Sequence, residues 1–279
     1  MTIRVAGSNW DVEMLRALAE HPPPAVGAEE RHLHVLQLLV DVIGDDVKVF
    51  LRRHGGKYVA RWRGSSDPGT AFVSWMAEYF LHLNDFIQVG HQSIATWSDA
   101  VQQARVLGDS VRLIMGMQFG YTLLVPMLVE EATGRPAYPV VHDQNPLVVD
   151  MYRERLRLGR PLILTTLNSA DIREWIDSDG IVLMNVDTSY AGTRHTRPLP
   201  FLDGHLTIPV RLLSLAVRRS FDIRAIAAPG AAGRVSLAVS SQLPGDVEQA
   251  LSGLGACFER WVAERPEQWM AWGSLSEVS

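Results

Sequence analysis

The chain has 279 residues, of which 47% are hydrophobic and 20% are charged, as is typical of a globular protein with a large core. The net charge of −5 argues against a general nucleic-acid-binding surface, and the single cysteine, Cys257, excludes an internal disulfide and disfavours a zinc cluster. No apolar run reaches about 18 residues, so we expect no transmembrane segment. Because the first residues lack the apolar core of a signal peptide, we expect a cytoplasmic location.

Residues 1–108 are predicted to form an N-terminal helical region that packs on the rest of the protein. Apolar residues recur at helical spacing in residues 31–56 and again through most of residues 67–108. Turn-forming residues interrupt the pattern at "HPPPAVGAEE" and "RGSSDPG".

Residues 109–279 are predicted to form an α/β core, because strand and helix patterns alternate along them. The strand patterns are "VRLIMGMQFG", "PAYPVVHD", "PLILTTL", "IVLMNVDTS", "DIRAIAAPG" and "RVSLAVSSQ". The helix patterns are "YTLLVPMLVEEATG", "NPLVVDMYRERLRLG", "SADIREWIDSDG", "TIPVRLLSLAVRRS" and "DVEQALSGLGACFERWVAERPEQW". Gly134 is placed to cap the first of these helices. This order predicts a central, largely parallel sheet flanked by helices.

Four stretches of the core carry a family resemblance. They are "RLIMGMQFGYTLL", "VVHDQNPLVVDMYRERLRLG", "DGIVLMNVDTSYAGTRHTRPLPFLDG" and "ERWVAERPEQWMAW". In this order they resemble the lysophospholipid acyltransferase-like superfamily, and within it the bacterial lipid A biosynthesis (lauroyl/myristoyl) acyltransferases. The resemblance covers roughly residues 70–272. It implies the acyltransferase-like fold, with the strand and turn of the first stretch at the active site.

The catalytic motif of that family is missing from the turn. The family uses a His with a carboxylate five residues later, so that the carboxylate orients the imidazole that deprotonates the acceptor. Gln118 and Leu123 stand at these positions, and glutamine cannot act as a base. None of the nine histidines has an acidic residue five positions on. The chain is therefore expected to keep the fold and to have lost the parent reaction.

The turn could still bind substrate. Gln118 can donate and accept hydrogen bonds, and Tyr121 follows it in the same turn, so we expect both to contact a polar substrate group. The alternative is that Gln118 only satisfies the backbone of the loop.

The most polar cluster runs from Asp187 to His205. It follows a predicted buried strand, and ligands of open α/β sheets bind where parallel strands end. Arg194, His195 and Arg197 place three basic side chains within four positions, which suits a phosphate, sulfate or carboxylate. Asp187 is a candidate catalytic base or arginine partner. The alternatives are a solvated loop for the basic residues and a turn-capping role for Asp187.

A second polar group, "HDQN", ends another predicted strand. His142 and Asp143 are candidate catalytic residues, and Asn145 is a candidate substrate-binding residue. Helix capping by Asp143 or Asn145 is the alternative. Together with Asp187, His142 and Asp143 are the leading candidates for the base that replaces the missing histidine, ahead of His195 and Glu130. No residue spacing supports a metal site, and no cofactor is expected.

These observations leave three hypotheses. The first is a divergent enzyme of acyltransferase-like fold in specialised (natural-product) metabolism, acting on a polar substrate that bears an anionic group and could be tethered to a carrier protein. It would transfer an acyl or amide group, or expel an anionic leaving group by intramolecular displacement. The second is the parent lipid acyltransferase reaction. The third is a non-catalytic lipid-binding module or subunit with a small protein partner, so the sequence leaves open whether the chain is an enzyme.

Overall fold

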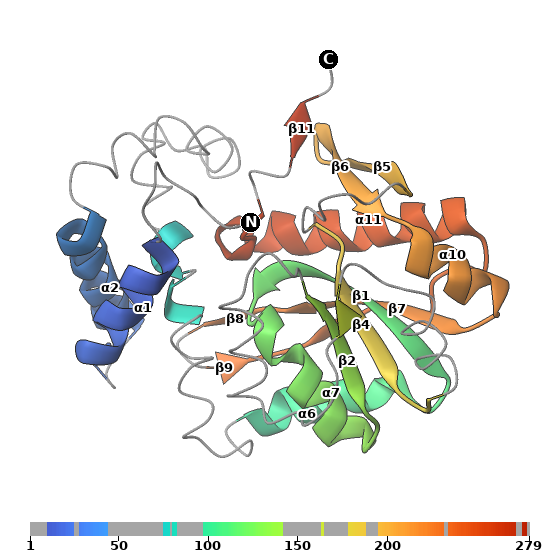
Figure 1. The fold of residues 1–279 in the computed structure, drawn as a ribbon, viewed down its shortest axis with the longest axis horizontal. Coiled ribbons are helices and arrows are strands. Elements are labelled where there is room, and N and C mark those ends of the chain that lie inside the picture. The colour runs from blue at the N-terminus through green and yellow to red at the C-terminus, as the bar shows by residue number, and fades with distance from the viewer. Residues whose placement is uncertain are drawn as a thin grey trace.

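The computed structural model describes residues 10–24, 28–43, 75–78, 80–82, 97–141, 163–164, 178–187, 195–231, 234–271 and 275–277. These residues form a layered α/β structure with a central, mostly parallel sheet between helices (Figure 1). The predicted class of fold is therefore confirmed. The boundary at residue 108 between a helical region and the core stays a prediction.

Within the described residues, the central sheet has six strands in the order β10-β7-β1-β4-β2-β3. The strands are β1 (Val111–Gly120), β2 (Ala137–Val141), β3 (Ile163–Leu164), β4 (Ile181–Asn185), β7 (Asp222–Ala228) and β10 (Ala238–Val239). Strand β1 pairs in parallel with β4 and β7, and β2 pairs in parallel with β4 and β3. Only β10 runs antiparallel to its neighbour within this sheet. The parallel strands therefore end at one common edge, called the carboxyl edge below.

Helices cover both faces of the sheet. In Figure 1, α6 (Ser98–Ala104) and α7 (Val125–Thr133) lie on one face, and α10 (Arg211–Arg218) and α11 (Val247–Glu264) lie on the other. Strand β1 is consequently apolar on both faces, and Leu113, Ile114 and Met115 are fully buried. A continuous apolar run is the usual pattern of a parallel strand covered on both sides.

The turn after β1 depends on Gly120. Its φ of +55° lies in the left-handed region, and an added Cβ would sit 2.2 Å from the carbonyl oxygen of Ala228. The next residue, Tyr121, donates its backbone N–H to that same oxygen at 2.8 Å. Only glycine allows β1 and β7 to approach so closely here, and the close approach fixes the direction in which the chain leaves the sheet.

The start and end of α7 follow from local signals. A short 3-10 turn, η4 (Thr122–Leu124), leads from the strand into the helix. Gly134 ends the helix in the left-handed conformation, with φ of +66°, and donates its N–H to Glu130 at 2.8 Å. This confirms the predicted cap, because glycine adopts that conformation without steric cost.

Arg135, directly after the cap, is buried and holds the opposite edge of the sheet together. Its guanidinium donates to the backbone carbonyls of Asp179 at 2.9 Å, Gly108 at 3.2 Å and Val111 at 2.9 Å. A planar group with five donors suits this arrangement, because the three acceptors come from two segments, the start of β1 and the residues before β4.

The polar segment after β4 differs from the prediction. Residues expected to form a loop and the first turn of a helix form a hairpin of β5 (Thr196–Phe201) and β6 (Gly204–Pro209), and α10 begins only at Arg211. Alternation explains the hairpin, because the buried residues Leu199 and Phe201 on β5 flank the exposed Pro200, and the buried residues Leu206 and Ile208 on β6 flank the exposed Thr207. With β11 (Ser276–Glu277), the hairpin makes a second, antiparallel sheet.

The segment from residue 234 to residue 268 is also divided more finely than expected. The stretch "RVSLAVSSQ" forms two short strands, β9 (Arg234–Val235) and β10, and β9 pairs with β8 (Gly230–Ala231). Helix α11 begins after Asp246, whose side chain caps it by accepting from the N–H of Gln249 at 3.0 Å. It ends at Glu264 and is followed by a 3-10 turn, η5 (Pro266–Gln268), because Pro266 has no N–H to continue the helix.

Helices also occur before the sheet begins. They are α1 (Trp10–Glu20), α2 (Ala28–Ile43), the helical residues 75–78 and 80–82, α6, and the 3-10 turn η3 (Arg105–Leu107). Trp75 joins this group to the core, since its indole N–H donates to the carbonyl of Trp269 at 2.6 Å. The predicted helix over residues 145–159 lies outside the described residues, as do residues 169–177 of the helix predicted over 169–180; residues 178–180 are described and are not helical.

Candidate functional site at the carboxyl edge

Asp187 lies at the carboxyl edge, two residues after β4, and is 2% exposed. Both of its carboxylate oxygens accept the backbone N–H of Gln118, at 3.0 and 2.9 Å. The indole N–H of Trp269 donates to Oδ2 at 2.8 Å. Removal from water raises the pKa of Asp187 to about 6, and the bonds from Trp269 and Gln118 only partly oppose this rise. A carboxyl group of this kind changes its charge close to neutral pH.

Gln118, at the position where the resemblance implies a catalytic histidine, is fixed through its backbone. Besides the bond to Asp187, its carbonyl accepts the N–H of Met270 at 2.7 Å. The next residue, Phe119, makes a bridge to Trp269. The Gln118 side chain is half-buried at the same edge. Its predicted contact with substrate stays a prediction.

Tyr121 is buried, and its ring lies against the ring of His82, with centroids 4.4 Å apart. The position of the tyrosine ring requires Gly230, where an added Cβ would come within 2.5 Å of it. His82 is 6% exposed and comes from the helical residues 80–82. Its Nε2 atom is 3.7 Å from a carboxylate oxygen of Glu78.

Sequence reasoning missed the pair of Glu78 and His82, because it looked for a carboxylate five residues after each histidine. Glu78 precedes His82 by four residues, which on a helix places the two side chains on one face. A Glu-x-x-x-His spacing in a predicted helix is the signal that could have found them.

The segment after α11 closes the carboxyl edge. The Gln268 side chain donates to the carbonyl of Gly230 and accepts its N–H at 3.1 Å, and both Gln268 and Trp269 are buried. The ring of Trp269 meets the ring of Phe201 edge-on, with centroids 5.0 Å apart. Gln268 and Trp269 therefore brace the carboxyl edge.

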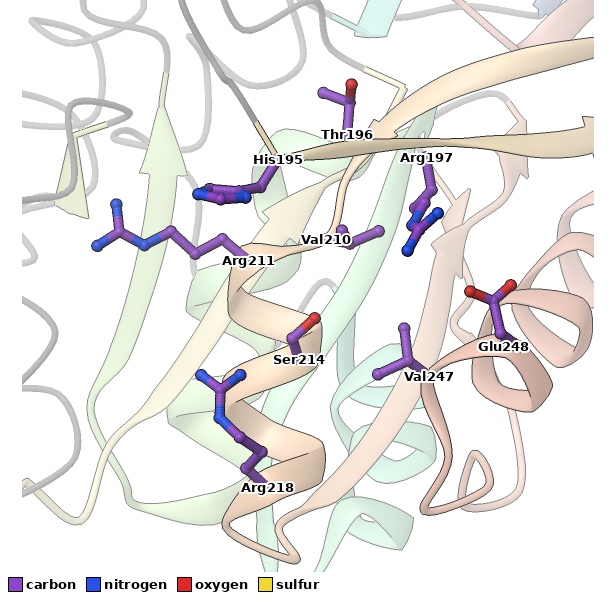
Figure 2. Close-up of a pocket in the computed structure, with 9 residues that line it drawn as sticks. All are labelled: His195, Thr196, Arg197, Val210, Arg211, Ser214, Arg218, Val247 and Glu248. Carbon is purple, nitrogen blue, oxygen red and sulfur yellow. The ribbon is translucent and has the colours of Figure 1, made fainter.

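Two basic residues of the predicted cluster, His195 and Arg197, lie beside a surface hollow. His195 and Arg197 are exposed at the start of β5 and line a hollow of about 580 Å³ (Figure 2). We call it the arginine hollow; its other lining residues are Thr196, Val210, Arg211, Ser214, Arg218, Val247 and Glu248. Sequence reasoning did not include Arg211 and Arg218, because only the packing of α10 beside β5 brings them to His195 and Arg197.

Other predicted site residues are placed as follows. His142, Asp143, Asn145 and Arg194 lie outside the described residues. Glu130 accepts the N–H of Ala137 at 2.9 Å, at the start of β2. It therefore lies at the edge of the sheet opposite to Asp187, and this placement argues against a role for Glu130 at the carboxyl edge.

Comparisons with known proteins add nothing to this geometry: no family model matches the chain, and no curated protein matches it. In the described part of the chain, every helix is too short or too polar to cross a lipid bilayer. Among those same residues, no three His, Cys, Asp or Glu side chains are placed to share a metal ion.

Proposed function

We propose that the chain is a divergent enzyme of acyltransferase-like fold, with its reaction centre at the turn that ends β1. One observation carries the proposal: two buried titratable side chains adjoin this turn. Asp187 bonds to the backbone of Gln118, and His82 packs on Tyr121, three residues further on. Buried titratable groups at the carboxyl edge of a parallel sheet favour acid–base chemistry over a purely structural role.

Each of the two groups suits proton transfer in a different way. The pKa of Asp187, about 6, is close to the operating pH that efficient general acid–base catalysis needs. The backbone N–H of Gln118 and the indole N–H of Trp269 donate to Asp187 and fix the position of its carboxyl group. Glu78 lies where it can orient the imidazole of His82.

We infer a substrate that is polar and bears an anionic group, free or tethered to a carrier protein, in specialised metabolism. The reaction is transfer of an acyl or amide group, or an intramolecular displacement that expels an anionic leaving group. Gln118 disfavours the parent lipid acyltransferase reaction, because an amide cannot take the proton of the acceptor hydroxyl. His142 and Asp143 stay additional candidates for the base.

A non-catalytic binding module is the second candidate. The observation that favours it is that Asp187 joins Gln118 and Trp269, which alone explains a buried carboxylate as a structural group. In this case the loss of the family histidine removed catalysis and left the fold to hold a ligand or a small protein partner.

Turnover separates the two candidates. The protein is incubated with acyl thioesters plus amine acceptors, and separately with compounds that carry an amine and a phosphate or sulfate ester. Release of thiol, phosphate or sulfate is then measured. We expect turnover that falls by about 10²–10⁴-fold in Asp187→Asn or in His82→Gln. The exposed Glu131→Gln variant is the control and should keep full activity. Absence of turnover with every substrate favours the binding module, and efficient acyl transfer to a lysolipid contradicts both.

A further inference from the structure

One face of α10 is polar and turned away from the sheet. Arg211, Ser214 and Arg218 are spaced at three and four residues, so they share a face of the helix. The opposite face is apolar and buried against the sheet through Leu212, Leu213 and Ala216. The amphipathic pattern that attaches α10 to the core therefore presents two arginines and a hydroxyl in a row.

The arginine hollow is completed by β5 and α11. Figure 2 shows the guanidinium of Arg197 entering it from β5 and that of Arg218 turned back along α10 toward Ser214. The carboxylate of Glu248 faces Arg197 from the first turn of α11. Arg211 and His195 lie together at one end of the hollow. The hollow thus combines several basic side chains with one carboxylate, that of Glu248, at the side of Arg197.

The guanidinium groups are not engaged elsewhere in the described structure. Within these residues, no hydrogen bond or ion pair holds Arg197, Arg211 or Arg218. The guanidinium groups of Arg197 and Arg218 are directed into the hollow, whereas that of Arg211 extends outward past His195 (Figure 2). An anion that enters the hollow can pair with Arg197 and Arg218 without breaking an ion pair within the described residues. Arginine is also the side chain that best matches a phosphate or sulfate, because its planar fork donates two parallel hydrogen bonds.

We propose that the arginine hollow binds a small phosphate or sulfate monoester that also carries an ammonium or hydroxyl group. The arginines hold the ester group, and Glu248 accepts hydrogen bonds from the ammonium or hydroxyl. The volume of about 580 Å³ is within the usual range of roughly 300–1,000 Å³ for small-molecule sites, and it exceeds the needs of an inorganic ion. Val210 and Val247 supply apolar wall for a short carbon chain.

This site is distinct from the proposed reaction centre. Phe201, at the end of β5, contacts Trp269, which bonds to Asp187. Arg197 lies four residues earlier on the same strand, roughly 13 Å away at the rise of an extended chain. The inference uses only the residues of the hollow, so it holds even if Asp187 and His82 prove not to catalyse a reaction.

Calorimetric titration of the whole protein with O-phosphoethanolamine, ethyl phosphate and inorganic phosphate tests the proposal. We expect O-phosphoethanolamine to bind most tightly, since it alone offers an ammonium to Glu248. Arg197→Gln and Arg218→Gln should each weaken its binding roughly tenfold to hundredfold, as expected for hydrogen bonds between charged groups. The matched control is Arg219→Gln, because Arg219 is an exposed arginine beside Arg218 that does not line the hollow. The Arg219→Gln variant should bind O-phosphoethanolamine as tightly as the wild type does.

Two further arms define the ligand. Glu248→Gln should remove the preference for O-phosphoethanolamine over ethyl phosphate, whereas Glu264→Gln, at the other end of α11, should leave it intact. Vesicles containing phosphatidic acid test a lipid headgroup as the source of the phosphate. The proposal is overturned if no soluble ester binds at millimolar concentration, if only the vesicles bind, or if Arg219→Gln weakens binding as much as Arg218→Gln. Asp187→Asn should bind O-phosphoethanolamine normally, which separates this site from the proposed function.

Discussion

Replacing Asp187 by asparagine is expected to remove a defined part of the pH dependence of stability. Burial raises the pKa of this carboxyl from 3.8 to about 6. Between these two values the folded protein holds a proton that the unfolded chain has released, so stability falls as pH rises through this window. Asp187 thereby contributes ~3 kcal/mol to the free energy of unfolding below pH 3.8, and this contribution is lost above about pH 6.

Urea unfolding at a series of pH values across this window measures the effect. The difference in unfolding free energy between wild type and Asp187→Asn should change by ~3 kcal/mol, with the wild type relatively more stable at the acidic end. In either orientation, asparagine places its NH₂ group against a buried N–H donor. This lowers the unfolding free energy of the variant by about 1–3 kcal/mol at every pH.

Trp269→Phe supplies an independent control for Asp187. It removes a hydrogen bond that lowers the pKa of Asp187, so the transition should move to higher pH. A difference between wild type and Asp187→Asn that does not vary with pH would refute the reasoning. An NMR titration in which the Asp187 carboxyl ionises near pH 3.8 would refute it as well.

Two further predictions concern the sheet. In chemical denaturation, Gly120→Ala should lower the unfolding free energy by about 1–3 kcal/mol more than Gly134→Ala. Both glycines have a left-handed conformation, but only at Gly120 would the added Cβ meet the backbone of Ala228. Equal losses would contradict the packing at the turn. Arg135→Lys should lower the unfolding free energy by about 2–3 kcal/mol, because an ammonium cannot reach all three carbonyls that the guanidinium holds. An unchanged unfolding free energy would show that these bonds do not stabilise the edge.

Local patterns in the sequence were sufficient to predict the central strands. The apolar run of β1 predicts a buried strand and Gly134 predicts a helix end, and the structure confirms both. The β5–β6 hairpin was missed because its charged and proline residues suggested a loop. The alternation of Leu199, Phe201, Leu206 and Ile208 was the better signal, but it is weak because each strand buries only one face against α11 and its neighbours.

The candidate site was predictable only where it follows directly from strand order. Asp187 was placed at a strand end by the sequence, and the structure puts it at the carboxyl edge. His82 reaches the same edge from residues 80–82, across a long interval of sequence, and no local pattern encodes that contact. The arginine hollow could not be predicted either, because Arg197 and Glu248 are far apart in sequence. They come together only when α10 and α11 pack beside β5.

The bonds from Trp269 to Asp187 and from Met270 to Gln118 have a consequence for the order of folding. They join the turn after β1 to residues far downstream, so the ends of a very long loop must meet before the turn is fixed. The inner strands can pair while that segment is still unfolded or still being synthesised. The carboxyl edge should therefore be the last part of the sheet to become rigid, and until Trp269 arrives, the carboxyl group of Asp187 stays hydrated and ionises as an ordinary surface acid.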